Sequence, residues 1–487
     1  MVGAVIDSIQ FLRVEEDEGN AGRAFATPFR PQTKLQTVSQ RSPAYTGNPT
    51  NDNDEVTMVR KQQGESRFAA AARRGLKVLG PGLITGASDD DPSGIGTYSQ
   101  AGAQLGFGIG WTMLVTFPLM AAIQEISARI GRTTGQGIAG NLCRHSPNWL
   151  LYAIVALLLI ANIINIGADL SAMGDALKLL IGGPGTVYAI LFGLVCVIAT
   201  VFLDYARYVT ILKWLTLVLF AYVAALFAIH VPWNEALLGI LVPHITWSTA
   251  FATTLVAIFG TTISPYLFFW QASQEAEDER VDHHAKPLKK APEQAPREFE
   301  RIRADTLIGM AFSNVIALSI IVTTATALNK AGITNVETSA QAAEALRPIA
   351  GAFAFVLFAL GIIGTGLLAV PILAGSAAYA VGEGCKWPVG LSRKPKQATA
   401  FYSILTAATV LGVGMTLTPI DPIKALYWAA VINGVVAVPV MSVMMVMTAQ
   451  RKIMGKFVVI GWLRWLGWAS TAAMAACVGG MIVSWFA

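Results

Sequence analysis

Long apolar stretches separated by short polar segments dominate the chain from residue 78 onward. A run of about 20 apolar residues is long enough to cross the hydrocarbon core of a bilayer as a helix. The expected spans cover residues 78–102, 107–128, 149–180, 185–203, 209–230, 251–274, 303–328, 350–381, 400–416, 423–448 and 458–485. The pattern therefore predicts an all-α integral membrane protein with about 11 transmembrane helices.

The first 75 residues break this pattern, because they are polar and rich in Asn, Gln, Ser, Thr and Glu. They contain no apolar run of the roughly 7–15 residues that a signal peptide requires. So little apolar surface cannot offset the entropy lost on ordering a chain. We expect residues 1–75 to form a disordered cytoplasmic tail that is not cleaved.

Charged residues make up 13% of the 487-residue chain, and hydrophobic residues 54%. Lys and Arg gather in every second loop, at residues 129–144, 207, 280–303, 386–396 and 451–456. Basic loops face the cytoplasm, so we expect a multi-pass protein of the plasma or inner membrane, with its N-terminus inside and its C-terminus outside. The net charge of +5 then reflects topology, and a nucleic-acid partner is not expected.

The charged run at residues 275–303 is expected to be a solvated cytoplasmic connector. Its adjacent His283 and His284 leave a metal-sensing role as the less favoured alternative. The four cysteines are too widely spaced to pair as metal ligands and imply no disulfide. Because the chain lacks HExxH, a phosphate-binding glycine loop and a Ser/His/Asp set, neither an enzyme nor a bound cofactor is predicted.

Three consecutive carboxylates interrupt the first span, at Asp89, Asp90 and Asp91, followed by Pro92. A charge inside a membrane helix costs roughly 2.5 kcal/mol or more, so these groups must line a cavity. Pro92 and Gly94 favour unwound backbone, whose freed carbonyls can join a carboxylate in binding a hard cation. A Pro-Gly kink capped by aspartate is the alternative, but a cap accounts for one aspartate only.

The sixth span carries a second interruption, where Pro265 follows Thr261 and Ser264. Breaks at matching positions of two halves are the best sequence indication of a transport site, although a simple proline kink remains the alternative. The spacing predicts a five-plus-five inverted repeat with broken first and sixth helices. Its two repeats and final helix are expected at residues 76–230, 250–448 and 458–485.

Other polar residues lie within apolar spans. Asp169 follows Asn162 and Asn165 at helical spacing, which predicts either a role in the ion pathway or a buried hydrogen-bond network. Glu125 and Arg129, one turn apart, are expected to form an ion pair, as a gate or as a structural contact.

In combination, these residues resemble the NRAMP (natural resistance-associated macrophage protein) family of divalent-metal transporters. That family pairs Gly-Pro-Gly with Asp-Pro-Gly-Asn in its first span, and this chain has Gly80-Pro81-Gly82 and Asp91-Pro92-Ser93-Gly94 at the same spacing. Further similar positions are Glu125–Gly131, Ala168-Asp169-Leu170, Asn314 and Asn433. The likeness covers about residues 78–450.

The resemblance implies a LeuT-like fold that binds a metal ion between the two breaks. Asp91 matches the family's metal-binding carboxylate, and Ser88 matches its nearby carbonyl ligand. Gly94 stands where the family has an asparagine ligand. In the sixth span, Ser264-Pro265-Tyr266 stands where the family has Met-Pro-His, and Thr261 matches a carbonyl ligand. Asn314 and Asn433 match positions near the permeation path.

These departures change the expected ion. A thioether favours transition metals, whereas a site of oxygen ligands suits Mg²⁺, which usually keeps several waters. Gly94 in place of asparagine predicts a roomier pocket, and Asp89 or Asp90 is expected to hold the ion's waters. The chain thus resembles the NRAMP-related magnesium transporter branch, whose members are described as uncoupled carriers of Mg²⁺ and Mn²⁺.

Proton coupling is expected to be weak. The family moves protons through a span-six histidine, an Asp and a Glu of span three, and arginines of span nine. Here Asp169 remains, but Ala172 and Tyr266 replace the Glu and the His, and span nine has no Arg. A free phenol has a pKa of about 10 and imidazole one of about 6.5. The alternatives are a proton-coupled Mn²⁺ or Fe²⁺ importer, and a sodium-coupled carrier of an organic solute.

Overall fold

The computed structural model describes residues 85–86, 88–202, 217–282 and 284–486. The predicted tail at residues 1–75 lies outside the described residues, as do Gly80–Gly82, Arg207 and His283. All regular structure in the described ranges is helical, with no strand among them, which confirms the all-α class.

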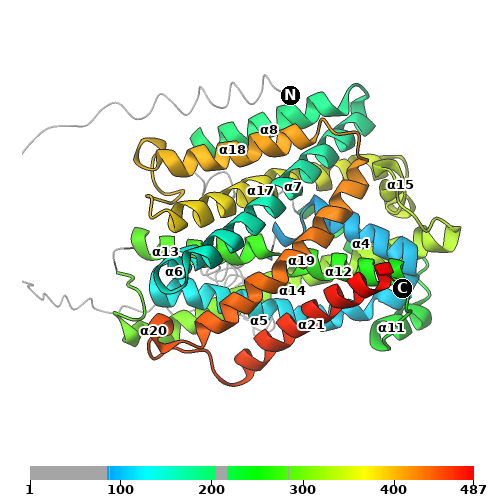
Figure 1. The fold of residues 1–487 in the computed structure, drawn as a ribbon. Coiled ribbons are helices and arrows are strands. Elements are labelled where there is room, and N and C mark those ends of the chain that lie inside the picture. The colour runs from blue at the N-terminus through cyan, green and yellow to red at the C-terminus, as the bar shows by residue number, and fades with distance from the viewer. Residues whose placement is uncertain (1–84, 87, 203–216, 283, 487) are drawn as a thin grey trace, which may run out of the picture. The chain divides into compact units, whose positions relative to one another are not determined.

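The helices carry the labels of Figure 1. In chain order they are α4 (Pro92–Leu105), α5 (Trp111–Thr134), α6 (Ile138–His145), α7 (Asn148–Ile181), α8 (Gly185–Phe202), α10 (Phe220–Ala228), α11 (Trp233–Leu241), α12 (Thr249–Thr262), α13 (Pro265–Val281), α14 (Ala295–Ala327), α15 (Ser339–Glu344), α16 (Arg347–Ala350), α17 (Ala354–Gly384), α18 (Thr399–Met415), α19 (Pro422–Thr448), α20 (Arg451–Met454) and α21 (Gly461–Phe486). Short 3-10 turns lie at Gly106–Ile109, Leu217–Leu219, Pro292–Gln294, Asn329–Ala331, Gly351–Phe353 and Pro395–Gln397.

Eight described segments are long and apolar enough to cross a membrane, with α12 and α13 counted together. Helix α18 is a shorter apolar helix. Helices α4 and α10 match the first and fifth predicted spans, of which the structure describes only part. The bounds agree closely with the sequence pattern, as in α7 for the predicted 149–180 and α19 for the predicted 423–448.

Both predicted helix breaks are present. Asp91 is extended and caps the first turn of α4, and a bend at Asp90 separates it from helical residues at Ser88 and Asp89. In the sixth span, α12 ends at Thr262 and α13 begins at Pro265, with Ser264 extended between them. In each case a proline occupies the first turn of the second half-helix, where its missing N–H costs no helical hydrogen bond.

The two halves of the broken sixth span pack against different neighbours. Helix α12 lies chiefly on α19 and α21, whereas α13 lies chiefly on α5 and α17. Two glycines bring these helices into backbone contact. A Cβ added to Gly260 would overlap the carbonyl oxygen of Ala430, and one added to Gly131 would overlap that of Ala272. Each half-helix is therefore held close to its own neighbour.

The charged run at 275–303 is only in part the solvated connector that the sequence predicts: the described residues of 282–290 are largely exposed between α13 and α14, but the acids at its start are not. Helix α13 continues through it to Val281, and the side chains of Glu275, Glu277 and Glu279 are buried. The reason is that these carboxylates meet arginines or other donors on neighbouring elements, so burial leaves them compensated. The Tyr379 hydroxyl, for example, donates a hydrogen bond to Glu277.

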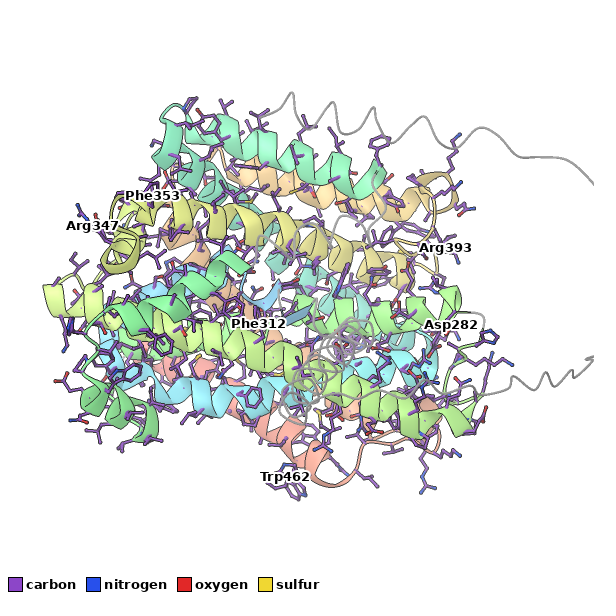
Figure 2. All side chains as sticks on the ribbon, turned by 180° about the vertical axis from the view of Figure 1, so that it is seen from behind. Asp282, Phe312, Arg347, Phe353, Arg393 and Trp462 are labelled. Carbon is purple, nitrogen blue, oxygen red and sulfur yellow. The ribbon has the colours of Figure 1, made fainter. Side chains whose placement is uncertain are left out.

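The loops predicted to be cytoplasmic gather at one end of the helices. The amides of Leu288 and Lys289 donate to the carbonyls of Arg132 and Thr133, and Lys289 Nζ donates to the carbonyl of Lys452. Asp282 and Arg393 lie at this charged end, and Arg347 and Phe353 lie at the opposite end (Figure 2). At the charged end lie α6, α13 and α20, and away from it lie α11, α15 and the C-terminal end of α21 (Figure 1).

Candidate functional site

Asp91 occupies the first break, and only 2% of its surface is exposed. Its Oδ1 accepts a hydrogen bond from the Gly94 amide at 2.8 Å. Its Oδ2 accepts one from Asn165 Nδ2 at 3.1 Å and lies 3.2 Å from the Tyr266 hydroxyl, which donates to it. Among the described residues, no Lys, Arg or His lies within ion-pair distance of it. The carboxylate is thus solvated by neutral donors and by the N-terminus of α4.

Tyr266 connects the two breaks. Its hydroxyl lies 3.0 Å from the carbonyl oxygen of Ser88, as well as near Asp91, and donates to both. The Ser264 hydroxyl turns back to the end of α12 and donates to the carbonyls of Gly260 and Thr261, each at 2.8 Å. The carbonyls of Ser88 and Thr261, both predicted ligands, therefore each accept a hydrogen bond from a hydroxyl of the second break.

Gly94 faces the second break directly. A Cβ built on it would lie 3.3 Å from Thr261 Oγ1, 3.3 Å from a ring carbon of Tyr98 and 3.2 Å from the carbonyl oxygen of Asp89. These distances are shorter than ordinary van der Waals contacts. The sequence predicts a roomier pocket at Gly94, but in this arrangement the missing side chain lets α4 and α12 approach each other, which closes that space.

Asp89 and Asp90 contact α14 through Ser313. The Ser313 hydroxyl lies 2.5 Å from Asp89 Oδ2 and 3.2 Å from Asp90 Oδ1, and donates to both. Both aspartates are fully buried. Their remaining oxygens have no hydrogen-bond partner within the described part of the chain. Sequence reasoning missed Ser313, although its neighbour Asn314 was a candidate.

The polar stripe of α7 is present and buried. Asn165 Nδ2 lies 3.5 Å from Asp169 Oδ2 and donates to it as well as to Asp91. Asn165 Oδ1 in turn accepts from Asn433 Nδ2 at 3.4 Å. Asn162 belongs to another contact, because its amide donates to the carbonyl of Leu373 on α17. Asn165 therefore joins Asp91, Asp169 and Asn433, a role that its place in the stripe did not reveal.

The remaining candidates lie apart from these contacts. Asn314 is half-buried, and its Oδ1 has no partner among the described residues. Glu125 and Arg129 form the predicted ion pair at 2.5 Å, and the Arg129 guanidinium also lies over the ring of Phe299. That pair lies in the half of α5 nearer the charged end.

The described residues contain no cluster of three or more His, Cys, Asp or Glu side chains that could hold a metal ion. At the breaks, the printed contacts of the one carboxylate Asp91 come from neutral amide and hydroxyl groups. Hard cations such as Mg²⁺ accept such ligands and retain water where protein oxygens are few. The same set is poor for soft metals, which favour sulfur or imidazole.

Comparison with known proteins places the chain among membrane carriers. The sequence model of the family described as "Natural resistance-associated macrophage protein-like" matches residues 82–484. The divalent metal cation transporter MntH of Klebsiella pneumoniae is 25% identical over 442 residues, which cover 88% of this chain and 98% of that protein. MntH of Acidiphilium cryptum is 25% identical over 437 residues, which cover 85% and 89%.

Solved structures are similar in fold. A manganese transporter of Eremococcus coleocola, in complex with an aromatic bis-isothiourea substituted compound, superimposes with a TM-score of 0.61 at 15% identity. The superposition covers 84% of this chain and 87% of that one. MhsT in complex with L-phenylalanine gives a TM-score of 0.51 at 10% identity, covering 83% and 97%. These likenesses confirm the LeuT-like fold and show the fold alone.

Proposed function

Because the chain belongs to the natural resistance-associated macrophage protein (NRAMP) family, we propose that it carries divalent metal cations across the membrane by alternating access, with Asp91 as the carboxylate ligand. The single observation that carries this proposal is the environment of Asp91. It is a buried carboxylate at a helix break, held by neutral donors with no basic partner among the described residues. An arriving cation supplies the charge that this arrangement lacks.

Mg²⁺ is the preferred cargo in this proposal, with Mn²⁺ as a second. The groups that contact Asp91 are the Gly94 amide, the Asn165 side-chain amide and the Tyr266 hydroxyl. The Ser88 carbonyl shares the Tyr266 hydroxyl, and the second break adds the Ser264 hydroxyl and the Thr261 carbonyl. Such a set suits a hard, partly hydrated ion. The names of the similar proteins, divalent metal cation transporter and manganese transporter, support a divalent cargo and Mn²⁺ as one candidate.

We propose that transport is only weakly coupled to protons. Tyr266 contacts the carboxylate where a histidine would exchange protons near neutral pH, and a phenol does not. One observation favours the alternative, a proton-coupled importer of Mn²⁺ or Fe²⁺. Asp169 is fully buried and forms no ion pair with any described residue, and buried carboxylates of this kind serve as proton carriers in membrane transporters.

The topology belongs to the same proposal. The breaks are assigned to inverted repeats at residues 76–230 and 250–448, with the N-terminus in the cytoplasm and the C-terminus outside. Support comes from the basic loops, which meet at one end, and from α21, whose last turns lie at the other. There the Thr249 hydroxyl, at the start of α12, donates to the carbonyl of Ser484.

The decisive experiment is uptake by the purified protein in proteoliposomes. Mg²⁺ and Mn²⁺ are offered separately and in competition, while an internal dye records pH. Saturable Mg²⁺ uptake that Mn²⁺ inhibits, without internal acidification, is the expected result. Mn²⁺ uptake with proton entry and no competition by Mg²⁺ would select the proton-coupled alternative.

Two variants assign the site in the same assay. Asp91→Ala should abolish uptake of either ion, because it removes the one carboxylate between the breaks. Asp282→Ala is the matched control, since this aspartate is exposed at the charged end. Undiminished uptake by Asp91→Ala would remove Asp91 from the site and this proposal with it.

A further inference from the structure

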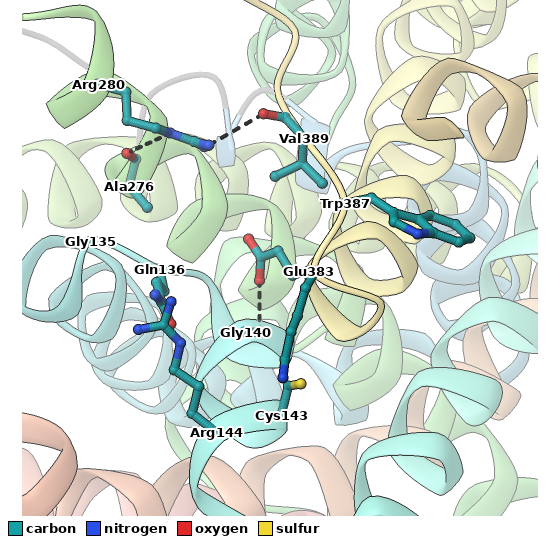
Figure 3. Close-up of a pocket in the computed structure, with 11 residues that line it drawn as sticks. Gly135, Gln136, Gly140, Cys143, Arg144, Ala276, Arg280, Glu383, Trp387 and Val389 are labelled. Atoms are coloured by element: carbon teal, nitrogen blue, oxygen red, sulfur yellow. Dashed lines mark hydrogen bonds between the residues drawn. The ribbon is translucent and has the colours of Figure 1, made fainter. Parts of the chain in front are cut away.

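A polar cavity lies at the charged end, between α6, α13 and the segment that follows α17 (Figure 3). Its volume is about 260 Å³. Three basic side chains line it, and each comes from a different element: Arg144 from α6, Arg280 from α13 and Lys386 from the segment after α17. Trp387 stands at its edge with 43% of its surface exposed.

The positive charges in this cavity are balanced only in part by the protein, because Glu383 is the one carboxylate among its lining residues. None of Arg144, Arg280 and Lys386 forms an ion pair with any described residue. Arg280 is held in place by hydrogen bonds that it donates to the carbonyls of Ala276 and Val389, each at 3.3 Å. Neutral acceptors of this kind orient a guanidinium and leave its charge available.

The single acidic side chain of the lining is otherwise engaged. Glu383 Oε2 accepts from the Gly140 amide at 3.0 Å, and Oε1 accepts from the Ser273 hydroxyl at 2.9 Å. It thereby ties α6 and α13 to the end of α17, as Figure 3 shows for Gly140. With three basic groups and one carboxylate, the lining carries a net positive charge.

Lys386 has a strained backbone. Its φ is +60°, and it is the one non-glycine residue in the described ranges with positive φ. The Trp387 amide donates to the carbonyl of Gly382, so Lys386 occupies the left-handed position after a helix, where glycine is normally found. A side chain there costs about 1 kcal/mol or more. Strained residues of this kind cluster at functional sites, so the strain at Lys386 points to a function of its side chain.

We propose that this cavity binds the phosphate group of an anionic ligand. Arginine forks and a lysine ammonium are the groups that hold phosphate oxygens, and three such groups line this cavity. The same charges repel Mg²⁺ and Mn²⁺, so the expected ligand is an anion and not the cargo. Its phosphate comes from a soluble phosphate or from a lipid headgroup.

The surroundings agree with either source. Trp149 and Tyr152 are strongly exposed at the start of α7, and Leu151 between them packs beside Gly384 at the end of α17. Exposed aromatic side chains of this kind mark the level of the membrane interface. A basic pocket at that level on the cytoplasmic side is a known form of anionic-lipid site. The open rim beside Trp387 also admits a soluble anion.

Two binding arms distinguish the sources, and neither needs transport activity. The full-length protein is placed in phosphatidylcholine nanodiscs and titrated with inorganic phosphate at constant ionic strength. In the second arm, nanodiscs contain increasing fractions of phosphatidic acid. Thermal unfolding is recorded in both, because a ligand that binds the native state raises the midpoint. A rise in the first arm identifies a soluble phosphate, and a rise in the second alone identifies a headgroup.

In the arm that shows a midpoint rise, the double variant Arg144→Gln/Lys386→Gln should lower the apparent affinity by at least about tenfold. Each charge-assisted hydrogen bond is worth about that factor or more. The control Arg303→Gln/Lys396→Gln removes the same charge from exposed positions outside the cavity, and it should change the apparent affinity by less than about twofold. Equal losses in the two double variants, or no midpoint rise in either arm, would overturn the proposal.

Lys386→Gly guards against a variant that merely misfolds. Glycine relieves the left-handed strain, so the protein without ligand should unfold at a slightly higher temperature. Binding in the arm that shows a midpoint rise should nevertheless fall severalfold. A purely structural lysine would give unchanged binding in this variant, and that result would also overturn the proposal.

Discussion

The helix breaks and the charged end of α13 both bury carboxylates, but only the charged end supplies arginines to meet them. Glu275 is 2.5 Å from Arg301, Glu298 is 2.9 Å from Arg301 and 3.3 Å from Arg132, and Glu279 is 3.8 Å from Arg132. At the breaks, Asp91 receives only amide and hydroxyl donors.

The difference has a physical meaning. A buried carboxylate with an arginine is neutral as a pair and contributes to structure, and removing one partner leaves an uncompensated charge. A buried carboxylate without one has no such reason to persist in a membrane helix, so it points to a function. The comparison therefore predicts opposite effects on transport and on stability when charges in the two regions are removed.

The largest effect is expected from Asp91→Asn. Divalent-ion uptake into proteoliposomes should fall by at least about hundredfold, since even an outer partner of a metal ligand is worth about 10- to 100-fold. The unfolding midpoint in detergent should stay the same or rise, because the variant removes a charge that has no basic partner. A midpoint that falls sharply would give Asp91 the structural role assigned to the acids of α13, and the contrast would be lost.

Arg301→Gln should have the next largest effect, on stability. It leaves Glu275, whose side chain is fully buried, without its arginine, and breaking such a pair costs about 3–5 kcal/mol of unfolding free energy. Thermal unfolding of the purified protein measures the loss. Arg303→Gln, at an exposed position two residues further on, is the control and should unfold as the natural protein does. Uptake per folded molecule should not change in either variant.

Tyr266→Phe should have a moderate effect that sharpens the comparison inside the site. It keeps the ring and removes the hydroxyl shared by Ser88 and Asp91. A hydrogen bond to a charged group is worth about 1.5–3 kcal/mol, so the apparent affinity for Mg²⁺ should fall by about tenfold or more. Tyr188→Phe removes an exposed hydroxyl that donates to the carbonyl of Gly182 and should leave the affinity unchanged. A complete loss of uptake in Tyr266→Phe would make the phenol essential for transport.

The smallest effect is expected from Arg347→Gln. Its partner Glu344 is 3.0 Å away, but both side chains are well exposed, at 66% and 34%. Exposed pairs contribute about 0–1 kcal/mol, so the unfolding midpoint should hardly move. A loss comparable with that of Arg301→Gln would show that pairing alone, without burial, decides the stability contribution.

Much of the fold follows from the sequence because each membrane helix is one continuous apolar stretch of the chain. Apolar length predicts the spans, within a few residues for α7 and α19 and within about eight where charged residues extend a helix, as in α13 and α14, and Pro92 and Pro265 predict both breaks. The candidate Asp91 and the stripe of Asn162, Asn165 and Asp169 were also apparent. Their assignment to a metal site stays a prediction.

The sequence was less informative where a partner lies far along the chain. The sequence of a mixed-charge run does not show whether its carboxylates are solvated by water or paired with arginines. Glu279, for example, lies near Arg132 of a different helix. The directions of Asp89 and Asp90 were hidden for a related reason. Which way a carboxylate points at an unwound turn depends on the backbone there and on a distant hydroxyl, Ser313.

The close contacts of Gly260 with Ala430 and of Gly131 with Ala272 have a mechanical consequence. They hold each half of the sixth span against a different group of helices. If the two groups move relative to each other, we expect the backbone to bend at the short extended segment around Ser264. A methyl group at either glycine would force the half-helix away from its neighbouring helix, at a position that does not contact the proposed cargo. Substitution of these two glycines should therefore be tolerated as poorly as substitution of Asp91, because it disturbs helix packing and not because it changes a ligand.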